Sequence, residues 1–186
     1  MTDLDVVLIK LTQEFPKFKI VRKEDSALMK FIDVFLRVIT FGKMTEFMHK
    51  FITTVSFVVY VPSDWTIFPP AQRAVILRHE RVHMRQRVKY GAFLYTLLYL
   101  LAPLPVGLAY FRAKFEREAY EETLRAMCEL YITGAGIIQS SSYRRSTIDH
   151  FMGAEYFWMW PFRKSTERWY DAAVKKAVAC SCVPRY

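Results

Sequence analysis

Two histidines, His79 and His83, stand four residues apart in a stretch that predicts a helix. The sequence has neither glycine nor proline from residue 71 to residue 90, and Pro69-Pro70 precede the stretch. Proline is tolerated in the first turn of a helix, where the amide has no partner anyway. Because residues four apart lie above one another on one helix face, both imidazoles can reach the same metal ion. Apolar residues recur at the same spacing, which predicts that this face is buried.

Glu80 follows the first histidine and completes the pattern H-E-x-x-H. A carboxylate in this position can take a proton from a water molecule that a metal ion has activated. The pattern therefore predicts a hydrolytic zinc site of the kind that cleaves peptide bonds, with His79 and His83 as ligands and Glu80 as general base. The alternative is a surface helix with two incidental histidines, although two of the chain's 4 histidines lie here.

A catalytic zinc ion needs three protein ligands and an open position, so a third ligand must come from elsewhere. The acidic run over residues 111–122 consists of strong helix formers, with Glu116 as the first candidate ligand and Glu118 as the second. The alternative for this run is a solvated helix face, because its charges form opposite pairs four residues apart. The cysteines are poor candidates because they show no C-x-x-C spacing: Cys128, Cys180 and Cys182.

An H-E-x-x-H helix followed by a helix that supplies a glutamate resembles the arrangement of the gluzincin metallopeptidases. The segment from Glu116 to Tyr120 is similar to the E-x-x-A-D element of the membrane-associated gluzincins. The resemblance covers roughly residues 52–125. It implies a zincin-like fold for a single domain over residues 1–186, a Zn²⁺ ion bound by His79, His83 and Glu116, and a peptide or protein substrate. Tyr120 stands where the family has an aspartate that orients a ligand histidine.

The expected fold class is α+β: a mainly helical domain with a small N-terminal sheet, in which the motif helix packs against the glutamate helix. Residues 17–22 and 51–61 have the composition of strands. The second strand is expected to be an edge strand with which an extended substrate can pair, and the alternative is an internal strand. The single domain has three expected parts: N-terminal helices and edge strand over 1–68, metal-site helices over 69–133, and a helical C-terminal part over 134–186.

Hydrophobic periodicity predicts helices over residues 4–15, 26–39, 71–90, 111–131, 144–160 and 165–178. Ser26 is a good N-cap for the second of these helices, and Gly42 follows its end. Gly134 and Gly136 predict a break in the chain, and the three serines over residues 140–142 predict a loop.

Residues 90–111 form an uncharged apolar segment between Lys89 and Arg112. A continuous helix of this length would cross a lipid bilayer, but Pro103 and Pro105 end or kink the helix after about 12 residues. Three interpretations stay open. The segment is a buried hairpin between the metal-site helices, a hairpin in or on a membrane, or an apolar surface that binds a partner protein.

The net charge of +9 favours anionic partners such as phospholipid, nucleic acid or an acidic polymer. The basic residues are scattered and not interleaved with aromatic ones, so no specific nucleic-acid binding is expected. The acidic start, Met1 to Asp5, is unlike a secretory signal, and three cysteines make no disulfide framework. We therefore expect a cytoplasmic or membrane-associated protein.

Peptide hydrolysis also needs a donor for the oxyanion that forms on the scissile carbonyl. His150 is the first candidate, ahead of Tyr143 and Tyr156, and a histidine that pairs with Asp149 or with solvent is the alternative. Two other functions stay open. One is a zincin-like structural or assembly protein, for instance a phage or membrane-complex component, whose metal is not used for turnover. The other is a membrane-docked interaction module that acts through residues 90–111.

Overall fold

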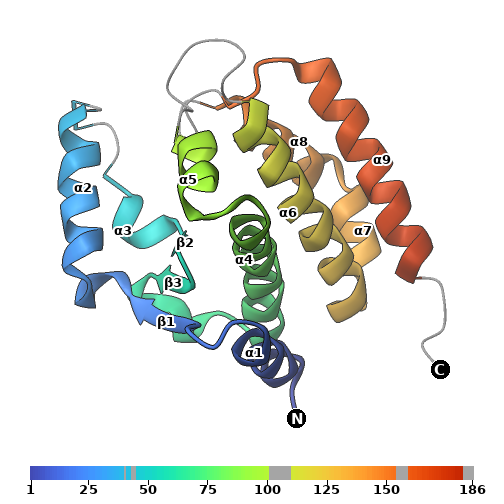
Figure 1. Ribbon diagram of the computed structural model, residues 1–186. Coiled ribbons are helices and arrows are strands. Elements are labelled where there is room, and N and C mark those ends of the chain that lie inside the picture. The colour runs from blue at the N-terminus through green and yellow to red at the C-terminus, as the bar shows by residue number, and fades with distance from the viewer. Residues whose placement is uncertain (40, 43–44, 101–109, 154–158, 182–186) are drawn as a thin grey trace. The chain divides into compact units, whose positions relative to one another are not determined.

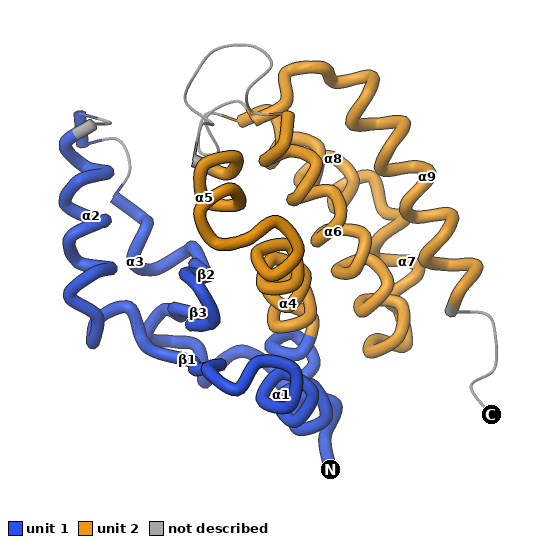
Figure 2. The backbone as a smooth tube through the Cα atoms, in the orientation of Figure 1, with its two compact units in different colours: residues 1–74 blue, residues 75–186 orange. Residues whose placement is uncertain are grey.

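The computed structural model describes residues 1–39, 41–42, 45–100, 110–153 and 159–181. The fold is mainly helical with one small sheet near the N-terminus, which confirms the expected α+β class (Figure 1). The chain forms two compact units, residues 1–74 and residues 75–186, and the boundary falls near the start of the motif helix (Figure 2).

The first unit combines a three-stranded sheet with short helices. Its strands are β1 (Lys19–Arg22), β2 (Thr53–Val55) and β3 (Val58–Val61). Its helices are α1 (Asp3–Glu14), α2 (Ala27–Ile39) and α3 (Phe47–Lys50), with 3-10 turns at Lys23–Asp25 and Ser63–Ile67. A buried apolar core forms from α1, β3 and the second 3-10 turn. Its residues include Leu4, Val7, Leu11, Phe15, Val59, Val61 and Trp65.

The single strand predicted over residues 51–61 is wrong, because this segment is a hairpin. β2 and β3 pair in antiparallel fashion with Val55 opposite Val58, and Ser56 turns the chain with a φ of 60°. β1 pairs with β3 in parallel, so the strand order is β1-β3-β2. β3 is therefore an internal strand and not the expected edge strand. β-Branched and aromatic residues run through both strands, so composition did not reveal the turn.

The second unit is a set of packed helices. They are most of α4 (Pro70–Tyr90), then α5 (Ala92–Leu100), α6 (Tyr110–Leu130), α7 (Gly134–Gln139), α8 (Ser141–Met152) and α9 (Arg163–Ser181). α6 packs against α5, α7 and α9. A buried cluster joins α6, α7 and α9: Leu124, Ile138, Tyr170, Ala173 and Ala177. The Tyr170 hydroxyl donates to the Ile138 carbonyl at 2.6 Å, which satisfies both buried groups.

The motif helix α4 lies against the glutamate helix α6, as the sequence predicted. Arg78 of α4 forms ion pairs with Glu122 at 2.6 Å and with Glu129 at 2.5 Å, both on α6. About two turns further along α4, Gln86 donates to the Phe115 carbonyl at 3.0 Å. These contacts hold the two helices together on both sides of the histidine pair.

Three predictions for the C-terminal part were wrong. Gly134 begins helix α7 and does not mark a break. Glycine is needed at this position because a Cβ atom would collide with a main-chain carbonyl of α6. Ser140 accepts a hydrogen bond from the amide of Tyr143 and caps α8, so the serines start a helix instead of a loop. α8 ends at Met152, short of the predicted residue 160, and residues 154–158 lie outside the described residues.

The uncharged segment over residues 90–111 begins as α5. Gly91, with a φ of 77°, separates α5 from α4 in the left-handed conformation that favours glycine. Residues 101–109, with Pro103 and Pro105, lie outside the described residues. No helix formed by the described residues has the length and apolar character needed to cross a membrane.

Candidate metal centre

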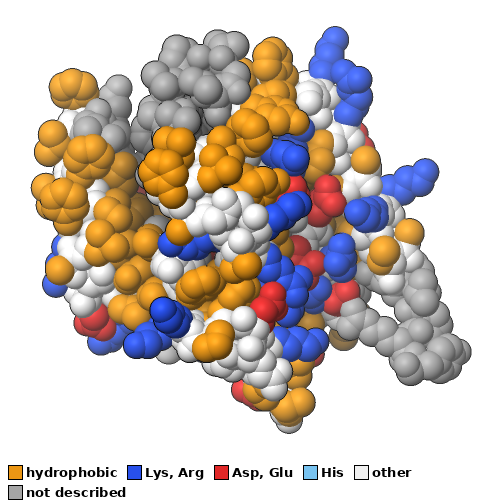
Figure 3. Space-filling model, in the orientation of Figure 1, with side chains coloured by type: hydrophobic (Ala, Val, Ile, Leu, Met, Phe, Trp, Pro, Cys, Tyr) orange, Lys and Arg blue, Asp and Glu red, His pale blue; other side chains and the backbone are white. Residues whose placement is uncertain are grey.

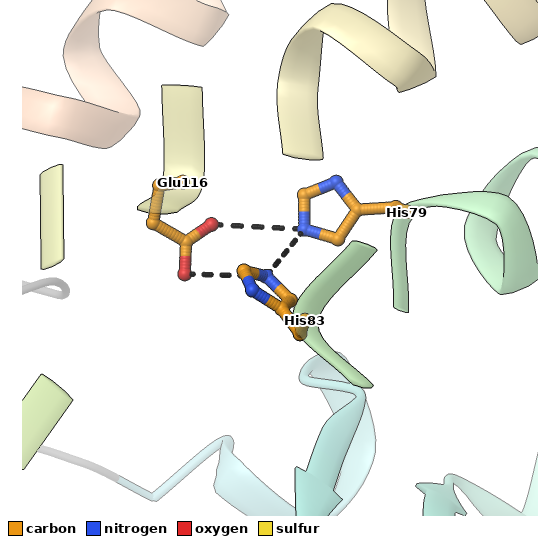
Figure 4. A group of neighbouring side chains, drawn as sticks. All are labelled: His79, His83 and Glu116. Carbon is orange, nitrogen blue, oxygen red and sulfur yellow. Dashed lines mark hydrogen bonds and ion pairs between the residues drawn. The ribbon is translucent and has the colours of Figure 1, made fainter. Parts of the chain in front are cut away.

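The two histidines of the motif point to the same place. His79 and His83 lie one turn apart on α4, and their Nε2 atoms are 3.2 Å from each other (Figure 4). Two imidazoles that bind one ion tetrahedrally, with metal–nitrogen bonds of about 2.05 Å, bring their nitrogens to about 3.3 Å. The spacing in this protein therefore suits a single shared ion.

Glu116 of α6 completes the group. Its Oε2 lies 3.6 Å from His79 Nε2, and its Oε1 lies 3.6 Å from His83 Nε2. The candidate ligand atoms of the three residues all lie within 4.8 Å of one another. His83 and Glu116 are buried, and His79 is half-buried. This group can hold a metal ion with two nitrogens and one carboxylate oxygen.

Each histidine is anchored through its other ring nitrogen. His79 Nδ1 lies 3.0 Å from Thr123 Oγ1, and the Thr123 hydroxyl lies 3.3 Å from the Ala119 carbonyl, to which it donates. Since that hydroxyl proton is used, the Thr123 oxygen accepts the Nδ1 proton of His79. The Nε2 lone pair of His79 then faces the centre of the group, as metal binding requires.

Gln86 orients His83 in the same way. Its Oε1 lies 3.0 Å from His83 Nδ1, while its Nε2 donates to the Phe115 carbonyl at 3.0 Å and to Glu118 Oε2 at 2.9 Å. These two acceptors fix the orientation of the amide, so its oxygen accepts the Nδ1 proton of His83. Glu118, the second candidate ligand from the sequence, thus orients Gln86 and is not part of the metal-binding group.

Tyr99 reaches the group from α5. Its hydroxyl donates to Glu116 Oε1 at 2.5 Å, and its ring packs edge-on against His83 with centroids 5.9 Å apart. The sequence did not predict a role for Tyr99, because the segment over residues 90–111 is distinguished only by its apolar character. The spacing of Tyr95 and Tyr99, four apart on one helix, was the only available signal.

Charge in the group is balanced between Glu116 and His83. Burial alone would raise the pKa of Glu116, but the charge of His83 and hydrogen bonds from both histidines hold it well below its usual range. Burial alone would lower the pKa of His83, but the Glu116 carboxylate raises it to about 9. In the metal-free protein a proton is therefore held among the ligands, and metal binding must displace it.

Two other candidates from the sequence, Glu80 and His150, are linked to this group, the first through its charge and the second through packed rings. Glu80 is buried, and its negative charge is one of the influences that raise the pKa of His83. His150 of α8 packs against Tyr120 with ring centroids 5.3 Å apart, and Tyr120 packs edge-on against His79 at 5.2 Å. Burial lowers the pKa of His150 to about 4, so its imidazole is neutral at pH 7.

Of the two tyrosines considered as oxyanion donors, the structure describes Tyr143, which is not part of the group. Tyr143 packs against the apolar cluster that joins α6, α7 and α9. Tyr156 lies outside the described residues.

Comparison with known proteins adds no family to this picture. The chain matches no protein-family model, and neither the curated proteins nor the solved structures contain a match to it. We therefore infer the function from the chain's own residues and their geometry.

Proposed function

We propose that this protein is a zinc-dependent metallopeptidase of the gluzincin type. The observation that carries the proposal is the convergence of His79, His83 and Glu116, with both Nδ1 atoms held by acceptors. Two imidazoles and a carboxylate make up the ligand set of many catalytic zinc sites, which keep a fourth position open for water. The arrangement of a motif helix against a glutamate helix supports the same proposal.

The proposed chemistry divides between the ion and the protein. When bound, Zn²⁺ would lower the pKa of a water molecule and polarise the scissile carbonyl. Glu80 takes the proton of the attacking water and delivers it to the leaving amine. The neutral His150 donates a hydrogen bond to the oxyanion once the substrate is in place.

Thr123 can take the role that the family resemblance assigns to an aspartate at position 120. The family resemblance puts an aspartate at position 120 to orient a ligand histidine, and this chain has a tyrosine there. The Thr123 hydroxyl, one turn further along α6, accepts from His79 Nδ1 at 3.0 Å and serves the same purpose. A neutral hydroxyl makes the histidine a weaker electron donor than a carboxylate does, so we expect weaker zinc binding.

The test combines metal analysis with Glu80→Gln. We expect the purified protein to contain one zinc ion, and His79→Ala to lose it. Glu80→Gln should keep the zinc ion and lose hydrolysis of a casein or peptide-library substrate by at least about 100-fold. Hydrolysis unchanged in Glu80→Gln would rule out the peptidase, and the structural or assembly protein whose metal is not used for turnover would then be the better interpretation.

A second candidate function, contact with a membrane surface, is favoured by the outer face of α5. Phe93, Leu94 and Leu97 are 82%, 45% and 42% exposed, and Figure 3 shows hydrophobic side chains at the surface along this helix. Residues 81–115 contain six basic residues and no acidic one. This combination suits the interface of an anionic bilayer.

Sedimentation with vesicles tests this second function. We expect the protein to bind vesicles containing phosphatidylserine, and Phe93→Ser to reduce the binding. Ile132→Ser removes an even more exposed apolar side chain of the same unit and should leave the binding unchanged. Equal binding by the two variants would rule out α5 as the contact.

A further inference from the structure

Arg112 lies beside the candidate metal centre. It stands four residues before Glu116 on α6, so the two side chains leave the same face of the helix. The Arg112 Cζ atom lies 5.1 Å from the centroid of the Tyr99 ring, and the Tyr99 hydroxyl is bonded to Glu116. The ring of Tyr99 thus links the guanidinium to the metal-binding group.

This guanidinium has no anionic partner among the described residues. Its Nε atom is buried and has no hydrogen-bond acceptor, and the guanidinium group lies over the face of the Tyr99 ring. Arg78 on α4 shows the contrast, because two carboxylates neutralise it. A half-buried guanidinium without an acceptor is unfavourable, and an anion that reached it would satisfy it.

We propose that Arg112 binds the free C-terminal carboxylate of a peptide whose scissile bond lies one or two residues earlier. This inference rests on the proposed peptidase function and names its substrate class. A carboxylate matches the planar fork of a guanidinium, which can donate two parallel hydrogen bonds to it. An extended chain advances roughly 3.5 Å per residue, so one or two residues span the distance from the metal-binding group to a guanidinium on the Tyr99 ring.

Binding is measured by calorimetry on zinc-loaded Glu80→Gln, which should not consume the peptide. Three probes are compared: N-acetylated tetra-alanine as the free acid, its C-terminal amide, and an amide with aspartate as the last residue. We expect the free acid to bind roughly 10- to 100-fold more tightly than either amide. This ratio of affinities corresponds to the free energy of a hydrogen bond to a charged group. Tightest binding of the aspartyl amide would overturn the terminal carboxylate in favour of an acidic side chain.

Variants then assign the preference to one side chain. Arg112→Met, made in the Glu80→Gln background, should bind free acid and amide equally, while Arg112→Lys keeps part of the preference. Lys114→Met removes the same charge from an exposed position on α6 and should keep all of it. Equal binding of acid and amide before any change at Arg112, no binding of the three probes, or a full preference in Arg112→Met would each overturn the subsite.

Turnover by the wild-type protein separates this inference from the function on which it rests. If free-acid peptides bind preferentially but no peptide is hydrolysed, the peptidase proposal fails and the carboxylate subsite stands. If acid and amide are hydrolysed at equal rates, the peptidase stands and the subsite fails.

Discussion

The Tyr99 hydroxyl donates a hydrogen bond to Glu116 Oε1 at 2.5 Å, which ties helix α5 to a candidate metal ligand. Burial and the nearby Glu116 charge raise the pKa of Tyr99 well above its ordinary value, so the hydroxyl keeps its proton. With one carboxylate oxygen occupied in this way, Glu116 presents the other, Oε2, to an ion. If the group holds an ion, Tyr99 would thus favour binding through one carboxylate oxygen, which would leave a position for water.

Removing this hydroxyl should weaken metal binding. We expect Tyr99→Phe to lower zinc affinity about 10-fold or more, as is usual when the partner of a metal ligand is lost. A competition titration with a chromophoric chelator measures the affinity. Tyr95 is a half-buried tyrosine one turn earlier on the same helix, so Tyr95→Phe is the matched control and should bind zinc as the wild type does. Identical affinities for the two variants would contradict the role assigned to Tyr99.

We expect zinc binding to depend on the hydroxyl group of Thr123 and not on the volume of its side chain. Thr123→Val keeps the volume of the side chain but leaves the Nδ1 proton of His79 without its acceptor. We expect a loss of zinc affinity of about 10-fold, while Thr123→Ser, which keeps the hydroxyl, stays within about 3-fold of the wild type. A valine variant that binds zinc normally would show that His79 needs no partner on α6.

His150 should make the metal-free protein less stable in mild acid. Its pKa falls from 6.5 to about 4 in the folded state because the imidazole is buried. Between these pH values the unfolded chain binds a proton that the folded one does not, so the free energy of unfolding decreases as the pH falls. The full effect is about 3 kcal/mol, reached near pH 4.

Urea unfolding at pH 7 and pH 4.5, with a chelator present, checks this pH dependence. His150→Gln should lose less stability than the wild type over that interval, because glutamine cannot take the proton. His49→Gln replaces an exposed histidine of the first unit and should behave as the wild type does. The same loss in all three proteins would refute the assignment to His150.

The sequence predicted which residues form the candidate metal-binding group better than it predicted their surroundings. His79 and His83 follow from the H-E-x-x-H motif on a predicted helix, and Glu116 from a charged helix with a family resemblance. Thr123 and Tyr99 could not be predicted, because their roles depend on how α5 and α6 are placed against α4. A local pattern fixes which residues share a helix face, but not which faces meet.

The fold predictions that were wrong failed for the same physical reason. Periodicity located most of the long helices within a few residues, but the end of α8, the turn at Ser56 and the helix that starts at Gly134 escaped it. Ser56 adopts a positive φ without being glycine, so no residue type marked the turn. Gly134 is required by the close approach to α6, a tertiary contact, and not by a break in the chain.

The ion pairs of Arg78 should hold the two helices of the metal centre together. Its side chain is 16% exposed and bonds to Glu122 and Glu129 of α6. Arg78→Met therefore takes this cation away from two poorly solvated carboxylates, of which Glu122 keeps its ion pair with Arg125 at 3.0 Å. We expect a loss of roughly 2–4 kcal/mol in urea unfolding, with weaker zinc binding. Arg163→Met breaks an exposed ion pair with Glu167 and should cost less than about 1 kcal/mol. Similar losses in the two variants would mean that burial does not strengthen the contact between α4 and α6.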